Sequence, residues 1–371
     1  MNESASDARQ LPPGDAAAPA IRVLLVEDSP VERELLRHLL SSDPQLLVVG
    51  VAADGEEGVA AAQRLRPDVI VMDIHMPRLD GFAAARQIME SCPTRIVMVT
   101  ASSQPQEVAA TFRALEAGAL SVLAKPVGPG SANFAAVAAE FIQTVKLMAE
   151  VPVVKRWPRV KTSPPQLPPP LAAAHPGTIS LVAIGASTGG PLALQEILAR
   201  LPSDFPVPLL VVQHISSGFT AGFAEWLGNS SGFPVRIAVP GERPAAGCAY
   251  LAPDGLHLGI DRDGGLQLAE TPPEYGMRPA AAYLFRSVTA AYGAAAIGVL
   301  LTGMGRDGAL ELRAMRQAGA VTIAQDRDSS IVFGMPGAAV QLGAASYVLP
   351  PIAIADTLRQ LLVADRAGPH E

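Results

Sequence analysis

Apolar segments of strand length alternate with amphipathic segments along most of this chain. Between residues 21 and 149 the apolar runs are separated by stretches in which hydrophobic residues recur at helical spacing. The runs are Arg22–Val26, Leu46–Ala52, Val69–Met72, Ile96–Val99 and Ser121–Ala124. Repeated βα units of this kind predict a doubly wound α/β domain, in which helices cover both faces of a parallel sheet.

The first amphipathic stretch illustrates the pattern. Ser29 followed by Pro30 is typical of a helix start, because serine caps free amides and proline suits the first helical position. The spacing predicts a helix over Val31–Leu40. On this helix Val31, Leu35, Leu36, Leu39 and Leu40 share one apolar face.

A second α/β series follows from residue 179 and predicts another parallel sheet, because most of its strands are apolar on both faces. The predicted strands are Ile179–Ile184, Leu209–Gln213, Val235–Val239, Ala295–Leu301 and Val321–Ala324. The predicted helices are Leu192–Ala199, Thr220–Leu227, Ala280–Ala291 and Ala309–Gln317. Between residues 240 and 275 the pattern weakens into short pieces broken by glycine and proline, which indicates hairpins or a surface excursion.

Two segments interrupt the alternation and define the domain boundaries. Residues 150–178 contain eight prolines and predict an extended, semi-stiff linker. Residues 1–20 are polar and predict a disordered tail. The expected organisation is therefore a tail, a first domain over 21–149, a linker over 150–178 and a second domain over 179–365.

Composition narrows the class of protein. The 371 residues include 49% hydrophobic residues and carry a net charge of −7, which disfavours binding to nucleic acid or to an anionic membrane. Two cysteines cannot form a disulfide framework, and no apolar run resembles a signal peptide or a membrane span. We expect a cytoplasmic monomer that does not insert into membranes.

Charged side chains gather at the predicted strand ends of the first domain. Glu27 and Asp28 follow the first strand, and Asp73 follows the third. Because carboxyl ends of parallel strands open into one crevice, these carboxylates converge and favour a hard divalent cation such as Mg²⁺. Thr100 and Lys125 end the next two strands, and a hydroxyl and an ammonium group suit a phosphoryl group.

A glycine-flanked serine marks the second domain. Ser187 lies in Gly185-Ala186-Ser187-Thr188-Gly189-Gly190-Pro191, between a predicted strand and a predicted helix. Strand, sharp turn and helix in this order are typical of a nucleophile elbow, which exposes the serine hydroxyl. A phosphate-binding turn or a merely close-packed turn is the alternative interpretation.

Two histidines are available as a base for this serine. His214 ends a predicted strand and thus shares the sheet edge with Ser187, whereas His257 lies in an irregular segment and is the weaker candidate. Asp307 follows the glycine-rich run after another buried strand and is a candidate for the acid that orients the imidazole. An N-cap role for Asp307 at the following helix is an equally good interpretation.

The first domain resembles the receiver domain of bacterial two-component response regulators. The likeness rests on Val26-Glu27-Asp28-Ser29, Met72-Asp73 through Pro77, Asp80-Gly81, Thr100 and Lys125-Pro126. It implies that Asp73 accepts a phosphoryl group from a histidine kinase, that Glu27, Asp28 and Asp73 hold Mg²⁺, and that Thr100 and Lys125 contact the phosphate. Val122 stands where many receivers carry Tyr or Phe as a rotamer switch. His75 lies two residues after Asp73 and either alters dephosphorylation or has no role in it.

Residues 179–365 resemble the catalytic domain of CheB-type chemotaxis methylesterases. The matching pieces are Ile184–Pro191, Gln213-His214, Ala252-Pro253 with His257-Leu258, and Leu301–Ala309. The resemblance implies a Ser187 nucleophile, a His214 base, an Asp307 acid and an oxyanion hole at the amides of Thr188 and Met304. Ile215 replaces a methionine that many relatives carry after the histidine.

This resemblance implies hydrolysis of glutamate methyl esters on methyl-accepting chemoreceptors, controlled by receiver phosphorylation. It also allows deamidation of receptor glutamines, and it implies no cofactor at the catalytic site. The principal alternative is a non-catalytic signalling module that only binds a receptor. A nucleotide-binding effector is disfavoured because this chain has no P-loop lysine in its glycine-rich turn. A DNA-binding regulator is excluded because residues 179–371 hold 12 basic against 16 acidic residues.

Overall fold

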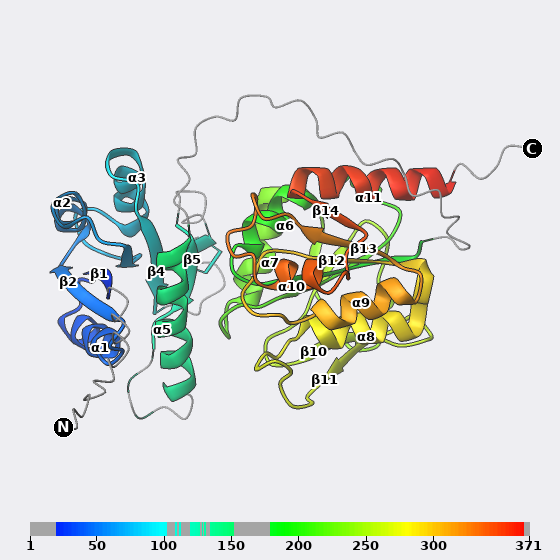
Figure 1. The fold of residues 1–371 in the computed structure, drawn as a ribbon, viewed down its shortest axis with the longest axis horizontal. Coiled ribbons are helices and arrows are strands. Elements are labelled where there is room, and N and C mark those ends of the chain that lie inside the picture. The colour runs from blue at the N-terminus through cyan, green and yellow to red at the C-terminus, as the bar shows by residue number, and fades with distance from the viewer. Residues whose placement is uncertain are drawn as a thin grey trace, which may run out of the picture.

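The computed structural model describes residues 20–101, 108–109, 111–112, 119–126, 128, 130, 134–151 and 179–366. The predicted tail and almost all of the predicted linker lie outside these residues. Within them the chain forms two α/β domains, coloured blue to teal and green to red (Figure 1). No helix among the described residues is long and apolar enough to cross a membrane.

The first domain is a five-stranded parallel sheet with the strand order β2-β1-β3-β4-β5. The order reverses between β1 and β3, so the carboxyl ends of these neighbouring strands open at the switch point, where such sheets place their ligands. The elements are β1 Ile21–Val26, α1 Pro30–Ser41, β2 Leu46–Ala52, α2 Gly55–Leu65, β3 Val69–Asp73, α3 Gly81–Ser91, β4 Arg95–Thr100, β5 Ser121–Ala124 and α5 Phe134–Glu150.

Helix α1 begins as its sequence predicts, but its buried face is narrower than its apolar face. Ser29 is the N-cap and accepts a hydrogen bond from the amide of Glu32. Leu36, Leu39 and Leu40 are buried, whereas Val31 is 80% exposed. Val31 is exposed because the first turn of α1 lies at the open carboxyl end of the sheet, beyond the strands that bury the later turns.

The second domain contains a seven-stranded parallel sheet in the order β14-β13-β12-β6-β7-β9-β8. Both sheets confirm the predicted doubly wound class. The elements are β6 Leu181–Ala186, α6 Gly190–Leu198, β7 Leu209–Gln213, α7 Thr220–Ser231, β8 Val235–Ile237, β9 Ala249–Leu251, β10 His257–Ile260, β11 Leu266–Ala269, α8 Ala281–Tyr292, the short 3₁₀ helix Gly293–Ala295, β12 Ala296–Leu300, α9 Ala309–Gln317, β13 Val321–Gln325, α10 Met335–Gln341, β14 Tyr347–Leu349 and α11 Pro351–Arg366.

The segment between residues 240 and 275 is only partly the predicted excursion. Strands β10 and β11 form the expected antiparallel hairpin. However, β9 inserts between β7 and β8 in the main sheet. Three residues are too few to display a strand period, so the sequence pattern did not reveal β9.

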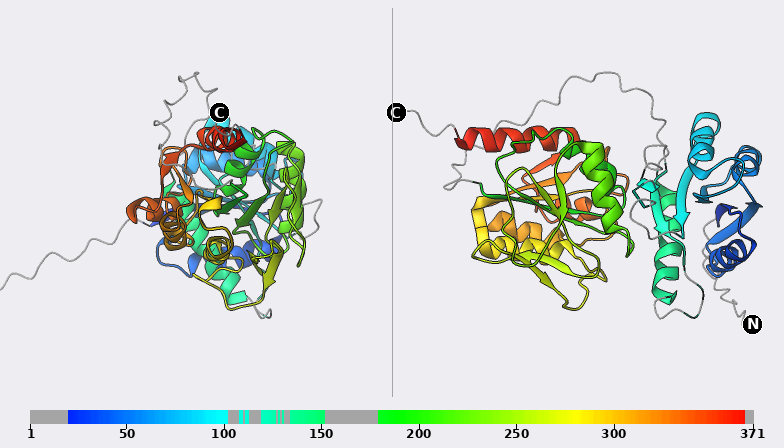
Figure 2. Two further views of the ribbon diagram at one scale, coloured as in Figure 1. Left: turned by 90° about the vertical axis from the view of Figure 1, so that its right-hand side faces the viewer. Right: turned by 180° about the vertical axis from the view of Figure 1, so that it is seen from behind.

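Two helical layers cover the seven-stranded sheet (Figures 1 and 2). Helices α6, α7 and α11 pack on one face, and α8, α9 and α10 pack on the other. The centre of the sheet is β12-β6-β7, whose residues are all buried. This rigid centre carries the candidate catalytic residues at its carboxyl edge.

The two domains touch through aromatic side chains. Figure 1 shows β5 and α5 on the side of the first domain that faces the second. Phe112, between β4 and β5, lies 5.2 Å from Phe223 and 5.4 Å from Trp226 of α7, measured between ring centroids. Ile331 and Val332, in the loop before α10, pack against the hydrophobic core of the first domain. The contact therefore buries apolar side chains from both domains.

Candidate active site

Ser187 lies in a tight turn between β6 and α6. Its amide donates to the carbonyl of Thr302 at 3.0 Å, and its carbonyl accepts from the amide of Gly190 at 2.8 Å. A Cβ at Gly303 would lie 2.6 Å from the Ser187 Cβ, so glycine is required where the neighbouring loop passes the serine. The serine is 7% exposed, and its hydroxyl has no hydrogen-bond partner within the described part of the chain.

The sheet register brings His214 beside Ser187. Ala186 pairs with Gln213, so the serine and the histidine directly follow partnered residues of β6 and β7. The amide of His214 donates to the carbonyl of Ala186 at 2.9 Å. The carboxyl edge of the sheet thus holds a hydroxyl and an imidazole on adjacent strands.

Asp307 contacts the histidine directly. His214 Nε2 lies 2.9 Å from Asp307 Oδ2, and both side chains are almost fully buried. His214 Nδ1 is buried and has no hydrogen-bond partner among the described residues. A carboxylate that accepts from one ring nitrogen leaves the other as the acceptor, so this arrangement prepares Nδ1 to take a proton.

The alternative N-cap role for Asp307 does not match the contacts of its carboxylate. Helix α9 begins after Gly308, which makes no side-chain cap. The carboxylate of Asp307 accepts instead from Ala281 N at 2.6 Å and Ala282 N at 2.9 Å, at the start of α8. Asp307 therefore occupies the N-terminus of a different helix, where free amides and the helix dipole favour its negative charge.

His257, the weaker candidate base, lies elsewhere in the fold. Its ring is fully buried, with Nε2 3.1 Å from the carbonyl of Pro272. Its Nδ1 accepts from the amide of Ala280 at 3.2 Å. Both ring nitrogens are occupied, so His257 has none left for a serine proton.

Two polar side chains support the site, although sequence reasoning did not select them. Gln213 Nε2 donates to the carbonyls of both Ser187 and His214 at 2.8 Å. Thr302 Oγ1 donates to the carbonyl of Thr188 at 2.9 Å. In each case a polar residue at the end of an apolar run was the sequence feature that could have indicated a place in the site.

The two candidate oxyanion-hole residues flank the serine. Thr188 follows it in the turn, and Met304 lies in the glycine-rich loop one residue after Gly303. Within the residues that the structure describes, neither backbone amide donates a hydrogen bond. These amides are thus available to a substrate oxygen.

The receiver candidates also converge. One carboxylate oxygen each from Glu27, Asp28 and Asp73 lies within 4.8 Å of the other two. Lys125 Nζ lies 2.8 Å from Glu27 Oε2 and 2.9 Å from Asp73 Oδ1. Thr100 is buried at the end of β4, and its carbonyl accepts from the amide of Lys125 at 2.8 Å.

Burial and neighbouring charges shift the pKa values of three side chains in this cluster. Burial raises the pKa of Glu27 to about 7, and the nearby Asp73 adds to the effect. Burial also raises the pKa of Asp73. Hydrogen bonds to Glu27 and Glu32 raise the pKa of Lys125 despite the opposing effect of burial. Glu32 Oε2 lies 2.5 Å from Lys125 Nζ. The sequence did not predict this contact, because Glu32 lies in helix α1 and not at the end of a strand.

This donor set fits Mg²⁺. The three converging groups are hard carboxylate oxygens, the ligand type that Mg²⁺ prefers. Three carboxylates against one lysine also leave negative charge that a divalent cation would offset.

Known proteins resemble the chain over nearly its full length. The family model described as CheB methylesterase matches residues 182–358, and the response regulator receiver domain model matches residues 23–133. The protein-glutamate methylesterase/protein-glutamine glutaminase 4 of Geobacter metallireducens is 54% identical over 92% of this chain and 99% of its own length. The chain belongs to the CheB methylesterase family. A family member from Syntrophus aciditrophicus, protein-glutamate methylesterase/protein-glutamine glutaminase 1, is 51% identical over 92% of this chain and 98% of its own.

Among solved structures, the CheB methylesterase catalytic domain of Thermotoga maritima is 37% identical to this chain. It covers 50% of this chain and 100% of its own length, with a TM-score of 0.48.

Two departures from the common pattern of receiver domains have distinct surroundings. His75 is exposed. Val122 is half-buried and packs against the receiver core and against the apolar cluster through which Phe112 contacts the second domain. The position that carries an aromatic switch in many receivers therefore lies next to the domain contact.

Proposed function

We propose that this chain hydrolyses γ-methyl esters of glutamate in methyl-accepting chemoreceptors and that phosphorylation of its receiver activates it. Ser187 is the nucleophile, His214 the base and Asp307 the acid that orients the imidazole. The observation that carries the proposal is the 2.9 Å contact between His214 Nε2 and Asp307, which leaves His214 Nδ1 without a partner at the sheet edge beside Ser187.

In the first step, His214 Nδ1 takes the hydroxyl proton while Ser187 Oγ bonds to the ester carbonyl carbon. The amides of Thr188 and Met304 donate to the resulting oxyanion, and one such donor contributes about 10²- to 10³-fold in rate. His214 then returns the proton to the departing methoxy group, which leaves as methanol.

Water completes the reaction. His214 accepts one proton of the water as its oxygen attacks the acyl-enzyme, and the Ser187 hydroxyl re-forms as the glutamate carboxylate departs. A glutamine side chain would follow the same steps with ammonia as the leaving group, and this supports deamidation as a second reaction.

A histidine kinase donates the phosphoryl group to Asp73 in this proposal. Glu27, Asp28 and Asp73 would hold Mg²⁺, which offsets negative charge during phosphoryl transfer. Lys125 and Thr100 contact the phosphoryl oxygens. The convergence of these side chains at neighbouring strand ends supports this assignment.

The domain contact supports control by occlusion. Ile331, which packs on the receiver core, would lie 2.6 Å from a Cβ at Gly189 in the serine turn. The unphosphorylated receiver thus lies close to the catalytic turn, and phosphorylation loosens its contact through Phe112 with α7. Both proposed sites belong to one chain, so the proposed control requires no second copy of the protein.

A non-catalytic receptor-binding module is disfavoured. Binding alone does not require a buried His–Asp pair beside an unpartnered serine hydroxyl, and the relatives that match nearly the whole chain are named as methylesterases.

The test is methanol release from methylated receptor membranes, with and without a small-molecule phosphodonor. Ser187→Ala should abolish release while Asp73 is still phosphorylated. Ser203→Ala is the matched control, because Ser203 is exposed in the loop before β7, at the opposite end of the sheet. Methanol release that survives Ser187→Ala would contradict the mechanism.

A further inference from the structure

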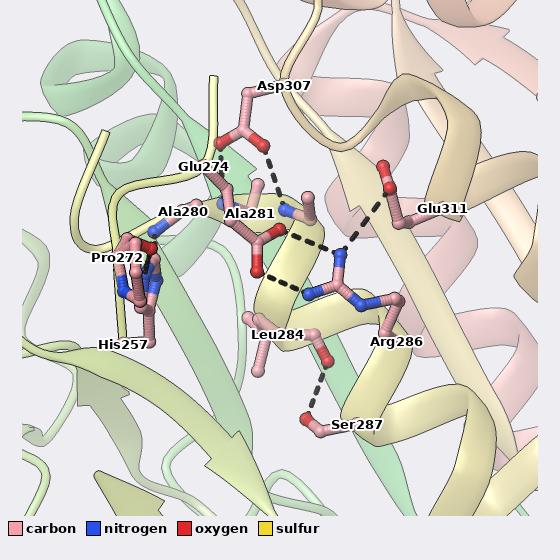
Figure 3. Close-up of polar contacts among 11 residues, drawn as sticks. His257, Pro272, Glu274, Ala280, Ala281, Leu284, Arg286, Ser287, Asp307 and Glu311 are labelled. Carbon is pink, nitrogen blue, oxygen red and sulfur yellow. Dashed lines mark hydrogen bonds and ion pairs between the residues drawn. The ribbon is translucent and has the colours of Figure 1, made fainter. Parts of the chain in front are cut away.

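The first amides of α8 are capped by side chains from other segments. Ala280 is the N-cap residue and makes no side-chain hydrogen bond of its own. Its amide donates to His257 Nδ1, and the next two amides donate to Asp307 Oδ2 and Oδ1. Figure 3 shows His257 and Asp307 around this helix start. Three consecutive amides therefore depend on one histidine and one aspartate distant in sequence.

His257 also holds the segment that leads into α8. Its Nε2 lies 3.1 Å from the carbonyl of Pro272, eight residues before Ala280. Because Nδ1 accepts, the ring proton must be on Nε2, where it donates to Pro272. The ring stacks on Tyr283 of α8 with 4.8 Å between ring centroids and 14° between planes. One fully buried imidazole thus joins both ends of the segment 272–280 and the first turn of α8.

A separate ion-pair network holds the middle of this segment. Arg286 of α8 forms a two-pronged contact with Glu274 and lies 3.6 Å from Glu311 of α9. Figure 3 shows this network on the side of α8 facing Glu311, away from His257. The helix body is therefore secured without His257, whereas the Ala280 amide depends on it.

We propose that His257 is a positioning residue for Asp307 and thereby for the catalytic imidazole. The sequence of contacts is short. His257 holds Ala280, the adjacent amides hold both oxygens of Asp307, and Oδ2 of the same carboxylate contacts His214. A shift of the α8 start would move the carboxylate relative to the imidazole. This inference rests on the proposed function of Asp307.

Two substitutions separate the two contacts of the imidazole. In His257→Asn the amide oxygen can occupy the place of Nδ1 and accept from Ala280. In His257→Gln the longer side chain places its amide near Nε2, so it can donate to Pro272 but leaves the Ala280 amide without an acceptor. We expect Gln to lower kcat by about 10- to 100-fold with little change in KM, because small displacements of catalytic groups have effects of this size. Asn should retain most of the activity.

Ser287→Ala is the matched control in full-length protein. Ser287 accepts from the amide of Ile260, so it joins β10 to α8 as His257 does, but farther along the helix from Asp307. Its substitution should leave kcat nearly unchanged. Titration of Ser187 with a fluorophosphonate normalises every rate to folded, reactive protein, so a partly unfolded variant still yields a valid kcat.

The decisive measurement is a double-mutant cycle with Asp307→Ala. If His257 acts through Asp307, His257→Gln should add little to the loss already caused by Asp307→Ala. Multiplicative losses would overturn the proposal, as would an Asn variant as impaired as the Gln variant. Failure of the proposed function is distinguishable, because wild-type protein would then release no methanol, or would release it independently of Ser187.

Discussion

Two buried aspartates, Asp73 at the end of β3 in the receiver and Asp307 in the loop after β12 in the second domain, have very different electrostatic surroundings. Asp73 shares its crevice with Glu27 and Asp28, and Lys125 contacts it at 2.9 Å. Asp307 instead accepts from two backbone amides and contacts His214. The first aspartate lies in a cluster of excess negative charge suited to a cation and a phosphoryl group. The second is held by backbone amides of α8 in contact with an imidazole, an arrangement suited to the orienting role proposed for it.

The largest effect is expected from Asp307→Asn. The asparagine amide group would present N–H donors toward the helix amides or toward His214, so the imidazole would lose its orientation. We expect kcat for methanol release to fall by about 10³- to 10⁴-fold. Asp261→Asn is the control, because Asp261 also accepts from two amides but in the β10–β11 turn. An Asp307→Asn enzyme with near-normal kcat would contradict the proposal that Asp307 orients the imidazole.

Asp73→Asn should remove control without removing the catalytic residues. The ratio of methanol release with and without phosphodonor should fall to unity, because the phosphoryl acceptor is lost. Asp80→Asn is the control, since Asp80 caps α3 and asparagine caps helices equally well. Stimulation that persists in Asp73→Asn would locate the phosphoryl group elsewhere.

The charge cluster also predicts a pH dependence of stability. Glu27 has a folded-state pKa of about 7 against the ordinary value of 4.5, so the folded protein binds its proton more tightly than the unfolded chain. The stability that this proton contributes is complete below pH 4.5 and is lost as the pH rises through about 7, amounting to at most about 3 kcal/mol.

Glu27→Gln should therefore gain stability relative to wild type as the pH rises from 5 to 8 in EDTA. Urea unfolding of both proteins measures this difference. Mg²⁺ should reduce it, because the cation stabilises the ionised wild-type cluster. A difference that is constant with pH would contradict the assignment of Glu27.

The smallest effect is expected at the domain contact. Phe112→Ala removes the ring that lies against Phe223 and Trp226. Loss of such aromatic pairs should raise unstimulated methanol release by at most about 10-fold and lower the stimulation ratio correspondingly. Leu47→Ala is the control, because Leu47 is 53% exposed on β2, at the opposite edge of the receiver sheet. Unchanged release in Phe112→Ala would argue against occlusion through this contact.

Strand ends were the predictable part of both candidate sites. Glu27, Asp73, Ser187 and His214 directly follow apolar runs, and carboxyl ends of parallel strands meet at one edge whatever the loops do. Asp307 was less predictable, because an aspartate before a helix equally indicates an N-cap. Gly308 is the N-cap of α9, while the Asp307 carboxylate reaches α8, and no local pattern distinguishes these outcomes.

The sequence by itself determined the two doubly wound domains and placed the chemistry at their sheet edges, because hydrophobic periodicity and the alternation of strands with helices are encoded locally. Only the tertiary structure decided that His257 supports α8, that Gln213 links Ser187 to His214 through their carbonyls, and that Phe112 joins the domains. These contacts depend on how helices and loops distant in sequence pack around the sheet. The local pattern of a single segment does not determine which distant segments it will contact.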